Sequence, residues 1–291
     1  MGRTTRLLVE GLQFGEGPRW RDGRLWFSDF YAHTVYSVSP AGDLRTEVEI
    51  DDQPSGLGWM PDGTLLIVGM TKRRVLRRGL DGQVGVHADL GHIATFHCND
   101  MVVDAAGGAY VGNFGFDLGA AIAERGVPDV LANHATAKLA YVTPDGQTRV
   151  AAEDLHFPNG SMITPDGKTL IVGETLAGVM TAFDIGPNGD LSNRRVWAST
   201  APAIPDGACL DAAGAVWIAN PNAPQCLRIA AGGEVLEIIE TGQPCYACML
   251  GGDDGRTLFI LTAAALDGAE AAAPTGKILV AQVDSPHAGR P

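Results

Sequence analysis

Positive charge is scarce in this sequence. It has 21 Lys and Arg against 34 Asp and Glu, a formal net charge of −13 at pH 7. Nucleic acids and anionic membrane surfaces are bound mainly through clustered Lys and Arg. The one basic cluster, KRRVLRR at 72–78, alternates with apolar residues and predicts the solvated face of an edge strand. We therefore expect no nucleic-acid partner.

Long apolar runs and cysteines are also few. The longest apolar run, TLFILTAAAL at 257–266, is far shorter than the ~20 residues that span a bilayer. The first residues, MGRTTRLLVEGLQF, lack the apolar segment and cleavage site of a secretory signal. Five cysteines, an odd number in a chain of this size, are typical of free thiols in a reducing compartment. These absences predict a cytoplasmic protein with no membrane partner.

Three common catalytic signatures are missing as well. No G-x-S-x-G segment occurs, so a serine-nucleophile esterase lacks its motif. No glycine-rich phosphate loop occurs, since GGDDG at 251–255 is typical of a hairpin turn. PCYAC at 244–248 contains C-x-x-C without a second pair, which favours thiols packed around an inner strand over a redox or zinc site.

Glycine, by contrast, is abundant, and much of it belongs to a repeated frame. Each copy has a short strand pattern, a turn glycine and a second strand rich in branched and aromatic residues, which is a hairpin signature. The copies begin at Glu16, Ser55, Asn99, Asn159, Asp206 and Ala247. These starts fall 39, 44, 60, 47 and 41 residues apart, close to the ~40–45 residues of a four-stranded propeller blade. The sequence predicts one all-β domain over 1–291, a six-bladed β-propeller.

The chain ends and one insertion complete this architecture. The segments RLLVE at 6–10 and KILVAQV at 277–283 are expected to share one blade and close the ring. The longest gap between frames contains 116–138, the one stretch with helical character. We interpret this insertion as a lid over the central opening, with a decoration of no consequence as the alternative.

The first residues of the frames occupy equivalent positions in successive blades, so they are expected to converge on the ring axis. Four carry a carboxylate or amide oxygen: Glu16, Asn99, Asn159 and Asp206. Such a hard oxygen set, with formal charge −2, suits Ca²⁺, Mg²⁺ or Mn²⁺ better than a structural zinc. The alternative is that these are ordinary turn residues, although Glu is a poor one. We predict one divalent cation, Ca²⁺ first, with Zn²⁺, Mn²⁺ or Mg²⁺ as alternatives.

Several frames also carry a resemblance to a known family. The segments EGPRW, CND, FPNG and IPDGACLDAAG occur in this order, with LSNRRVW at 191–197 before the last. They resemble the regucalcin/gluconolactonase family of six-bladed propellers over nearly the whole chain. The resemblance implies a divalent metal held by Glu16, Asn159 and Asp206, with Asn99 as a ligand or substrate contact and Asp206 as the base. Members of that family are chiefly lactonases, with related phosphotriester hydrolases.

One substrate position departs from the family pattern. Sugar-lactone hydrolysing members usually have Arg two residues before the third-frame Asn, and this chain has His97 there. The loss of a guanidinium fork removes a rigid, multi-donor contact for hydroxyl groups, so aldonolactones are not the expected substrate. A further polar contact, commonly Glu, falls near Asp117. We predict that His97, Asn99, Asn113 and Asp117 contact the substrate.

These observations predict a metal-dependent hydrolase that opens a small-molecule lactone with metal-activated water, with Asp206 and Asn99 as catalytic residues. Two alternatives remain. One is a non-catalytic propeller, stabilised by the ion, that binds a ligand or a protein partner. The other is a metal-dependent phosphotriester hydrolase.

Overall fold

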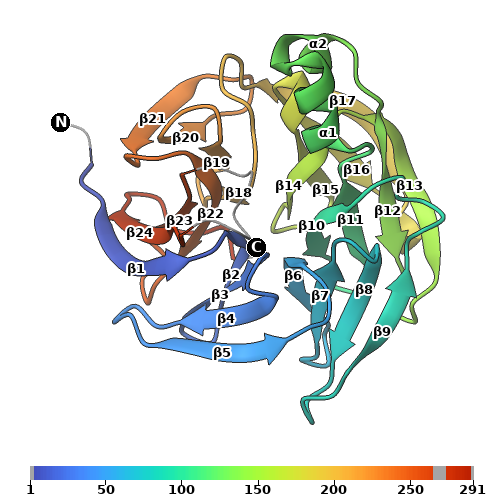
Figure 1. Ribbon diagram of the computed structural model, residues 1–291, viewed down its shortest axis with the longest axis horizontal. Helices are drawn as coiled ribbons and strands as arrows, with labels where there is room; N and C mark the ends of the chain where they lie inside the picture. The colour runs from blue at the N-terminus through green and yellow to red at the C-terminus, as the bar shows by residue number, and fades with distance from the viewer. Residues whose placement is uncertain (1–2, 265–272, 290–291) are drawn as a thin grey trace.

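The chain forms a ring of six antiparallel sheets, each of four strands (Figure 1). The computed structural model describes residues 3–264 and 273–289. The innermost strands of neighbouring sheets contact one another around the ring. This architecture confirms the predicted all-β, six-bladed propeller.

The strands fall into four concentric layers (Figure 1). The innermost are β2 (Gly15–Arg21), β6 (Pro54–Trp59), β10 (Cys98–Val103), β14 (Pro158–Ile163), β18 (Ala208–Leu210) and β22 (Cys245–Gly251). The second layer comprises β3 (Arg24–Asp29), β7 (Leu65–Gly69), β11 (Ala109–Asn113), β15 (Thr169–Glu174), β19 (Val216–Asn220) and β23 (Thr257–Thr262). The third comprises β4 (Thr34–Val38), β8 (Arg74–Arg78), β12 (Ala137–Val142), β16 (Val179–Ile185), β20 (Gln225–Ile229) and β24 (Gly276–Gln282). The outermost are β5 (Leu44–Glu49), β9 (Val84–Asp89), β13 (Thr148–Leu155), β17 (Leu191–Ser199), β21 (Val235–Glu240) and β1 (Arg6–Leu12).

The two ends of the chain meet in one blade, as predicted. Strand β1 pairs antiparallel with β24, with Arg6 opposite Val280 and Leu12 opposite Gly276. Because the N-terminal strand completes a sheet begun by C-terminal strands, the ring closes through backbone hydrogen bonds.

The basic cluster at 72–78 does not form an edge strand, so that prediction is wrong. It lies on β8 and the turn before it, and β9 covers β8 on the outer side. Its charges are compensated by neighbouring carboxylates. Lys72 and Arg74 contact Asp51 at 2.7 and 2.6 Å, and Arg77 contacts Asp62. Ion pairing, rather than an edge position, accounts for the basic residues.

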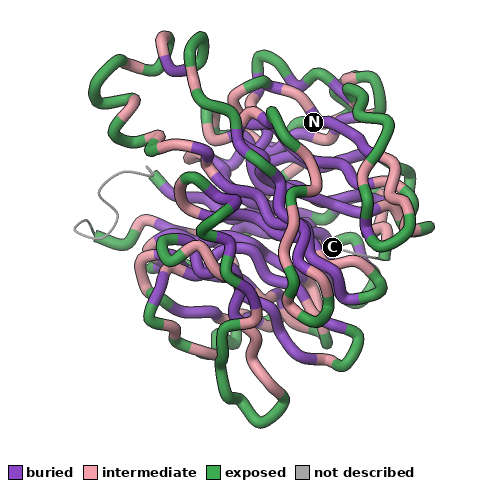
Figure 2. The backbone as a smooth tube through the Cα atoms, turned by 90° about the vertical axis from the view of Figure 1, so that its right-hand side faces the viewer, coloured by how far each residue is buried: buried purple, intermediate pink, exposed green. Residues whose placement is uncertain are grey.

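Burial follows the layers of strands. Strands β7, β11 and β19 are buried at every residue, because LLIVG, AYVGN and VWIAN are rich in branched and aromatic residues. Figure 2 shows the buried inner strands inside a more exposed outer layer. All five cysteines are free and buried, and four of them pack in the core cluster around Trp217 and Phe259. The expectation that the C-x-x-C thiols pack around an inner strand is confirmed.

The predicted helical character within 116–138 is confirmed by two short helices, α1 (Leu118–Arg125) and α2 (Val127–Ala132), which follow β11. No residue of α1 is buried, and only Val130 is buried in α2. Two 3-10 turns lie at Thr175–Ala177 and Pro187–Gly189. Within the described residues, no helix is long and apolar enough to cross a membrane.

Candidate functional site

A β-bulge recurs where the frame residues lie on the inner strands. The pairing register shifts between Glu16 and Arg19 on β2, between Cys98 and Met101 on β10, and between Pro158 and Ser161 on β14. A bulge re-aims the side chains next to it, so Glu16, Asn99 and Asn159 emerge from strands at equivalent points. The alternative that these three are ordinary turn residues is therefore wrong.

Glycines after the frame residues allow the blades to approach closely. A Cβ on Gly160 would lie 2.4 Å from the Asp206 carbonyl oxygen, and one on Gly56 would lie 2.4 Å from the Met101 nitrogen. Gly160 N–H also donates a hydrogen bond to Asp206 O at 3.2 Å. A larger residue would separate neighbouring blades, so glycine is needed for packing at the axis.

A chain of hydrogen bonds orients the two amides. Ser55 Oγ donates to Asn99 Oδ1, Asn99 Nδ2 donates to Asn159 Oδ1, and Asn159 Nδ2 donates to Thr175 Oγ1, each at 3.1 Å. Thr175 Oγ1 in turn donates to Pro205 O at 2.8 Å. In this chain Asn99 and Asn159 each donate through Nδ2 and accept through Oδ1. Each amide oxygen has two lone pairs, so each keeps one for a further partner.

The four oxygen-bearing frame residues line one cavity of about 420 Å³, which we call the axial cavity. Glu16, Asn99, Asn159 and Asp206 are all buried. Much of the remaining lining is apolar: Phe14, Phe30, Phe114, Phe157, Leu176, Ile204, Tyr246, and Leu118, Ile122, Val127, Val130 and Leu131 of the two helices. The structure thus brings together the four residues predicted as a metal site, next to an apolar region that the sequence did not predict.

Burial governs the electrostatics of the two carboxylates. The pKa of Glu16 is raised well above its ordinary value by burial, and then by the charges of Asp206 and Asp100. The pKa of Asp206 is also raised well above its ordinary value by burial and by Asp100, against hydrogen bonds from Asn159 and Gly207. Neither carboxylate forms an ion pair within the described part of the chain.

Two buried charged residues beside the site were not predicted from the sequence. Asp100 and Arg19 are both buried, and the charge of Arg19 lowers the pKa of Asp100 while burial raises it more. The Arg19 guanidinium donates to the carbonyl oxygens of Pro18 and Met101. The signal was present as Arg in EGPRW and Asp in CND, two charged residues inside strand patterns.

Three of the four predicted substrate contacts do not line the axial cavity. The Asn113 side chain donates to Lys138 O at 2.6 Å and accepts from Gly115 N–H at 3.0 Å. Asp117 is exposed and caps α1 by accepting from Ala120 N–H at 2.9 Å. The His97 ring stacks on Phe96 with centroids 4.1 Å apart, and burial lowers the pKa of His97. Each of the three residues thus has local contacts within the chain, and their contact with a substrate stays a prediction.

The donor set fits a hard divalent cation. Two carboxylates and two amide oxygens line one cavity, and among the described residues neither buried carboxylate has an ion-pair partner. Within the described residues, no group of three or more His, Cys, Asp or Glu is arranged to hold a metal. The site therefore lacks the ligands of a structural zinc centre, and its oxygens are those that calcium prefers.

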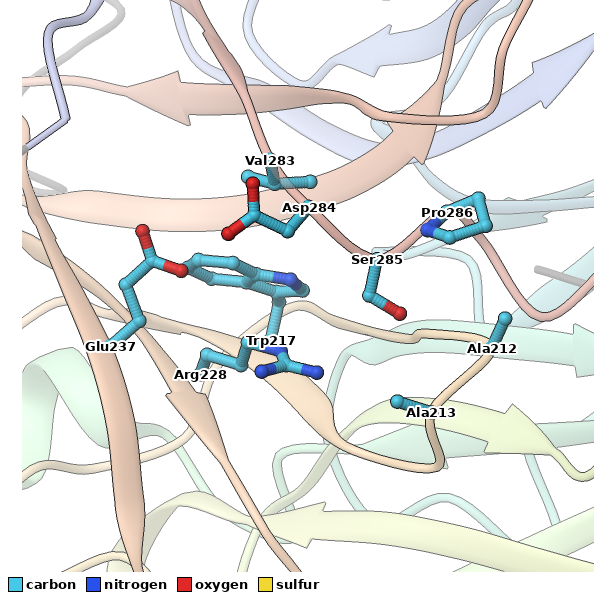
Figure 3. Close-up of a pocket in the computed structure, with 9 residues that line it drawn as sticks. All are labelled: Ala212, Ala213, Trp217, Arg228, Glu237, Val283, Asp284, Ser285 and Pro286. Carbon is cyan, nitrogen blue, oxygen red and sulfur yellow. The ribbon is translucent and has the colours of Figure 1, made fainter.

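A second cavity, of about 380 Å³, lies elsewhere in the molecule, and we call it the Trp217 cavity. Figure 3 shows the Trp217 indole between Asp284 and Arg228. Arg228 Nε donates to Asp211 Oδ2 at 2.7 Å. Arg3 pairs with both Glu237 and Asp284, the latter at 2.6 Å. None of the four oxygen-bearing frame residues lines this cavity.

The fold and the axial cavity together define a six-bladed propeller whose oxygen-lined pocket is formed by side chains from several blades. Residues 14–264 match the SMP-30/Gluconolactonase/LRE-like region, and the chain belongs to that family.

Individual relatives agree with this assignment. The chain is 31% identical to a regucalcin from Danio rerio, with 88% of this chain and 85% of that protein covered. It is 24% identical to a 6-deoxy-6-sulfogluconolactonase from Pseudomonas putida, with 95% and 94% covered. Among solved structures, the calcium-binding protein regucalcin from Agrobacterium tumefaciens superposes with a TM-score of 0.76. That superposition covers 99% of this chain and 97% of the other, at 18% identity, and shows the common fold.

Proposed function

We propose that this protein is a divalent-metal-dependent hydrolase that opens a lactone ring in the axial cavity. The observation that carries the proposal is the pair Glu16 and Asp206, two buried carboxylates that face one cavity without an ion-pair partner in the described chain. A buried charge is costly unless it is paired or bound to a metal. The family membership and the lactonase from Pseudomonas putida support a lactone as the substrate class.

Glu16, Asn99, Asn159 and Asp206 would hold the cation, and calcium best matches these oxygen donors. A divalent cation bound there supplies Lewis acidity toward the lactone carbonyl and lowers the pKa of water. The residues of the chain then divide the remaining work. Asp206 accepts the proton of the attacking water and returns it to the ring oxygen as the acyl C–O bond breaks. Asn99, fixed by Ser55, orients the carbonyl or that water.

The helical insertion forms part of the wall of the axial cavity. Apolar side chains of its two helices line the axial cavity. His134 Nε2 lies 2.8 Å from His156 Nδ1, so a hydrogen bond connects the segment after α2 to the segment before β14. We propose that the insertion is a lid, and that its closure over the partly open cavity would strengthen electrostatic interactions within it.

The test is lactone turnover before and after metal removal. Protein treated with a chelator and dialysed should lose turnover of a panel of aliphatic, aromatic and sugar lactones, and added Ca²⁺ should restore it. Residual metal is measured by elemental analysis, and circular dichroism checks that the stripped chain stays folded. Unchanged turnover in fully stripped protein contradicts the proposal. Calorimetric metal binding with no turnover anywhere in the panel favours the non-catalytic alternative.

A further inference from the structure

The helices of the insertion present apolar side chains that the protein itself leaves uncovered. Ile122 of α1, Val127 and Leu131 of α2 are 37%, 50% and 41% exposed, and all three line the axial cavity. A surface helix normally turns its apolar residues toward a core. Apolar residues that are exposed and gathered on the wall of a cavity indicate an apolar ligand.

An aromatic wall lines the same cavity. Phe14 packs on Tyr246 with ring centroids 4.6 Å apart and on Phe30 at 5.3 Å. Phe114 packs on Phe157 at 4.3 Å. Rings that are held by one another form a preformed apolar surface, so a ligand contacting them requires little reorganisation.

Beyond the predicted metal site, the described lining residues with polar side chains are Thr175, Asn222 and Tyr246. Thr175 Oγ1 already donates to Pro205 O, and the described lining includes no Lys, Arg or His. A ligand hydroxyl buried without a hydrogen bond costs roughly 1–3 kcal/mol. A polyhydroxylated ring would therefore leave several of its groups unpaired here.

From these observations we infer that the substrate is a lactone bearing a large apolar substituent, an alkyl chain or an aryl group. This inference rests on the proposed hydrolase function. The ester group lies at the four oxygen-bearing residues, and the substituent lies between the helices of the insertion and the aromatic wall. The volume of about 420 Å³ falls within the ~300–1,000 Å³ of small-molecule sites and leaves room beyond a bare lactone ring.

The first experiment measures binding separately from turnover. The probes are piperidin-2-one and 6-pentylpiperidin-2-one, cyclic amides that resist hydrolysis, titrated into calcium-loaded protein by calorimetry. Full burial of a methylene favours binding about 4-fold, and in a partly open cavity we expect about 2-fold for each carbon. The pentyl compound should therefore bind at least about 30-fold more tightly. Equal affinities overturn the inference.

The second experiment measures turnover with the matching esters. The kcat/KM for δ-decalactone should exceed that for δ-valerolactone by a similar factor, mainly through a lower KM, and D-glucono-δ-lactone should be the poorest substrate. Efficient hydrolysis of gluconolactone with no gain from the alkyl chain overturns the inference and leaves the hydrolase standing. Tight binding of the pentyl lactam with no hydrolysis of any lactone overturns the proposed function, and with it the lactone as substrate, and leaves only an apolar binding site in the axial cavity.

Variants locate the apolar contact. Leu131→Asp should reduce the ratio of pentyl to bare lactam affinity by about 10-fold or more, because a carboxylate faces the alkyl chain. Leu131→Met, which keeps an apolar side chain of similar size, should preserve the ratio. Leu80→Asp is the matched control, since Leu80 is 80% exposed and does not line the axial cavity. An equal reduction by Leu131→Asp and Leu80→Asp, or none in Leu131→Asp, contradicts the location.

Discussion

The carboxylates at the axial cavity and those at the Trp217 cavity differ in their ion pairing. Around the Trp217 cavity, Asp211 is paired with Arg228, and Glu237 and Asp284 with Arg3. In the axial cavity, Glu16 and Asp206 are buried and have hydrogen bonds, but within the described chain they have no ion pair.

Burial of a charge is costly, and a partner that lies in the chain itself offsets that cost in the folded protein. At the Trp217 cavity, ion pairs within the chain therefore offset the cost of burying charged side chains. Burial of the axial pair costs stability, and the cation that we propose there would offset this cost, which is the pattern expected of a functional site. Substitutions at the axial cavity should therefore lower activity, and substitutions at the Trp217 cavity should lower the free energy of unfolding.

The largest expected effect is at the axial cavity. Asp206→Ala should lower kcat by about 100- to 10,000-fold at saturating Ca²⁺, because the variant lacks the general base. Metal occupancy is checked independently by calorimetry. Asp284→Ala is the control, since its side chain is 92% exposed, and it should keep wild-type turnover. Wild-type turnover in a fully metallated Asp206→Ala protein would show that Asp206 is not the base.

The next effect concerns stability at the Trp217 cavity. Asp211→Asn should lower the free energy of unfolding by about 2–3 kcal/mol, because it leaves the largely buried Arg228 charge without its partner. Urea denaturation measures this loss, and calcium affinity should not change. The double variant Asp211→Asn with Arg228→Met should recover part of the stability. Full stability in the single variant would mean that the pair contributes nothing.

Glu16→Gln should lower calcium affinity without lowering the stability of the metal-free protein, the opposite of Asp211→Asn. The change removes one negative charge from the oxygen set, so calcium affinity should fall about 10-fold or more. The metal-free protein should be as stable as wild type or up to about 1 kcal/mol more stable, because a buried, uncompensated charge has been removed. Calorimetry and urea denaturation of the stripped protein measure the two quantities. A large loss of metal-free stability would place Glu16 among the structural carboxylates.

The smallest effect is expected for Arg3→Ala. Its partner Asp284 is exposed, and both Arg3 and its other partner Glu237 are partly exposed, so the loss should be at most about 1 kcal/mol. The loss should shrink further in 1 M salt, which screens surface charges. Urea denaturation at low and high salt measures it. A loss as large as that of Asp211→Asn would show that the ion pairs of Arg3 contribute as much stability as the pair of Arg228 and Asp211.

The architecture was predictable because it depends on local patterns. The six frames combine a turn glycine with two short apolar strands, and such hairpins form from neighbouring residues. The basic cluster at 72–78 was wrongly predicted to be an edge strand, because alternation of basic and apolar residues does not distinguish an outermost strand from its neighbour. The ion pairs that explain the basic residues involve Asp51 and Asp62, which no periodicity of the strand itself reveals.

The sequence by itself determined the number of blades, the closure of the ring and the residues that occupy equivalent frame positions. Tertiary structure alone decided which other side chains reach the axial cavity. Asp100 and Arg19 are buried beside it, while Asn113 and Asp117 form local hydrogen bonds and do not line it. The physical reason is that spacing along the chain specifies strands and turns. The direction of a side chain depends on bulges, caps and contacts between blades, which form only when distant segments pack together.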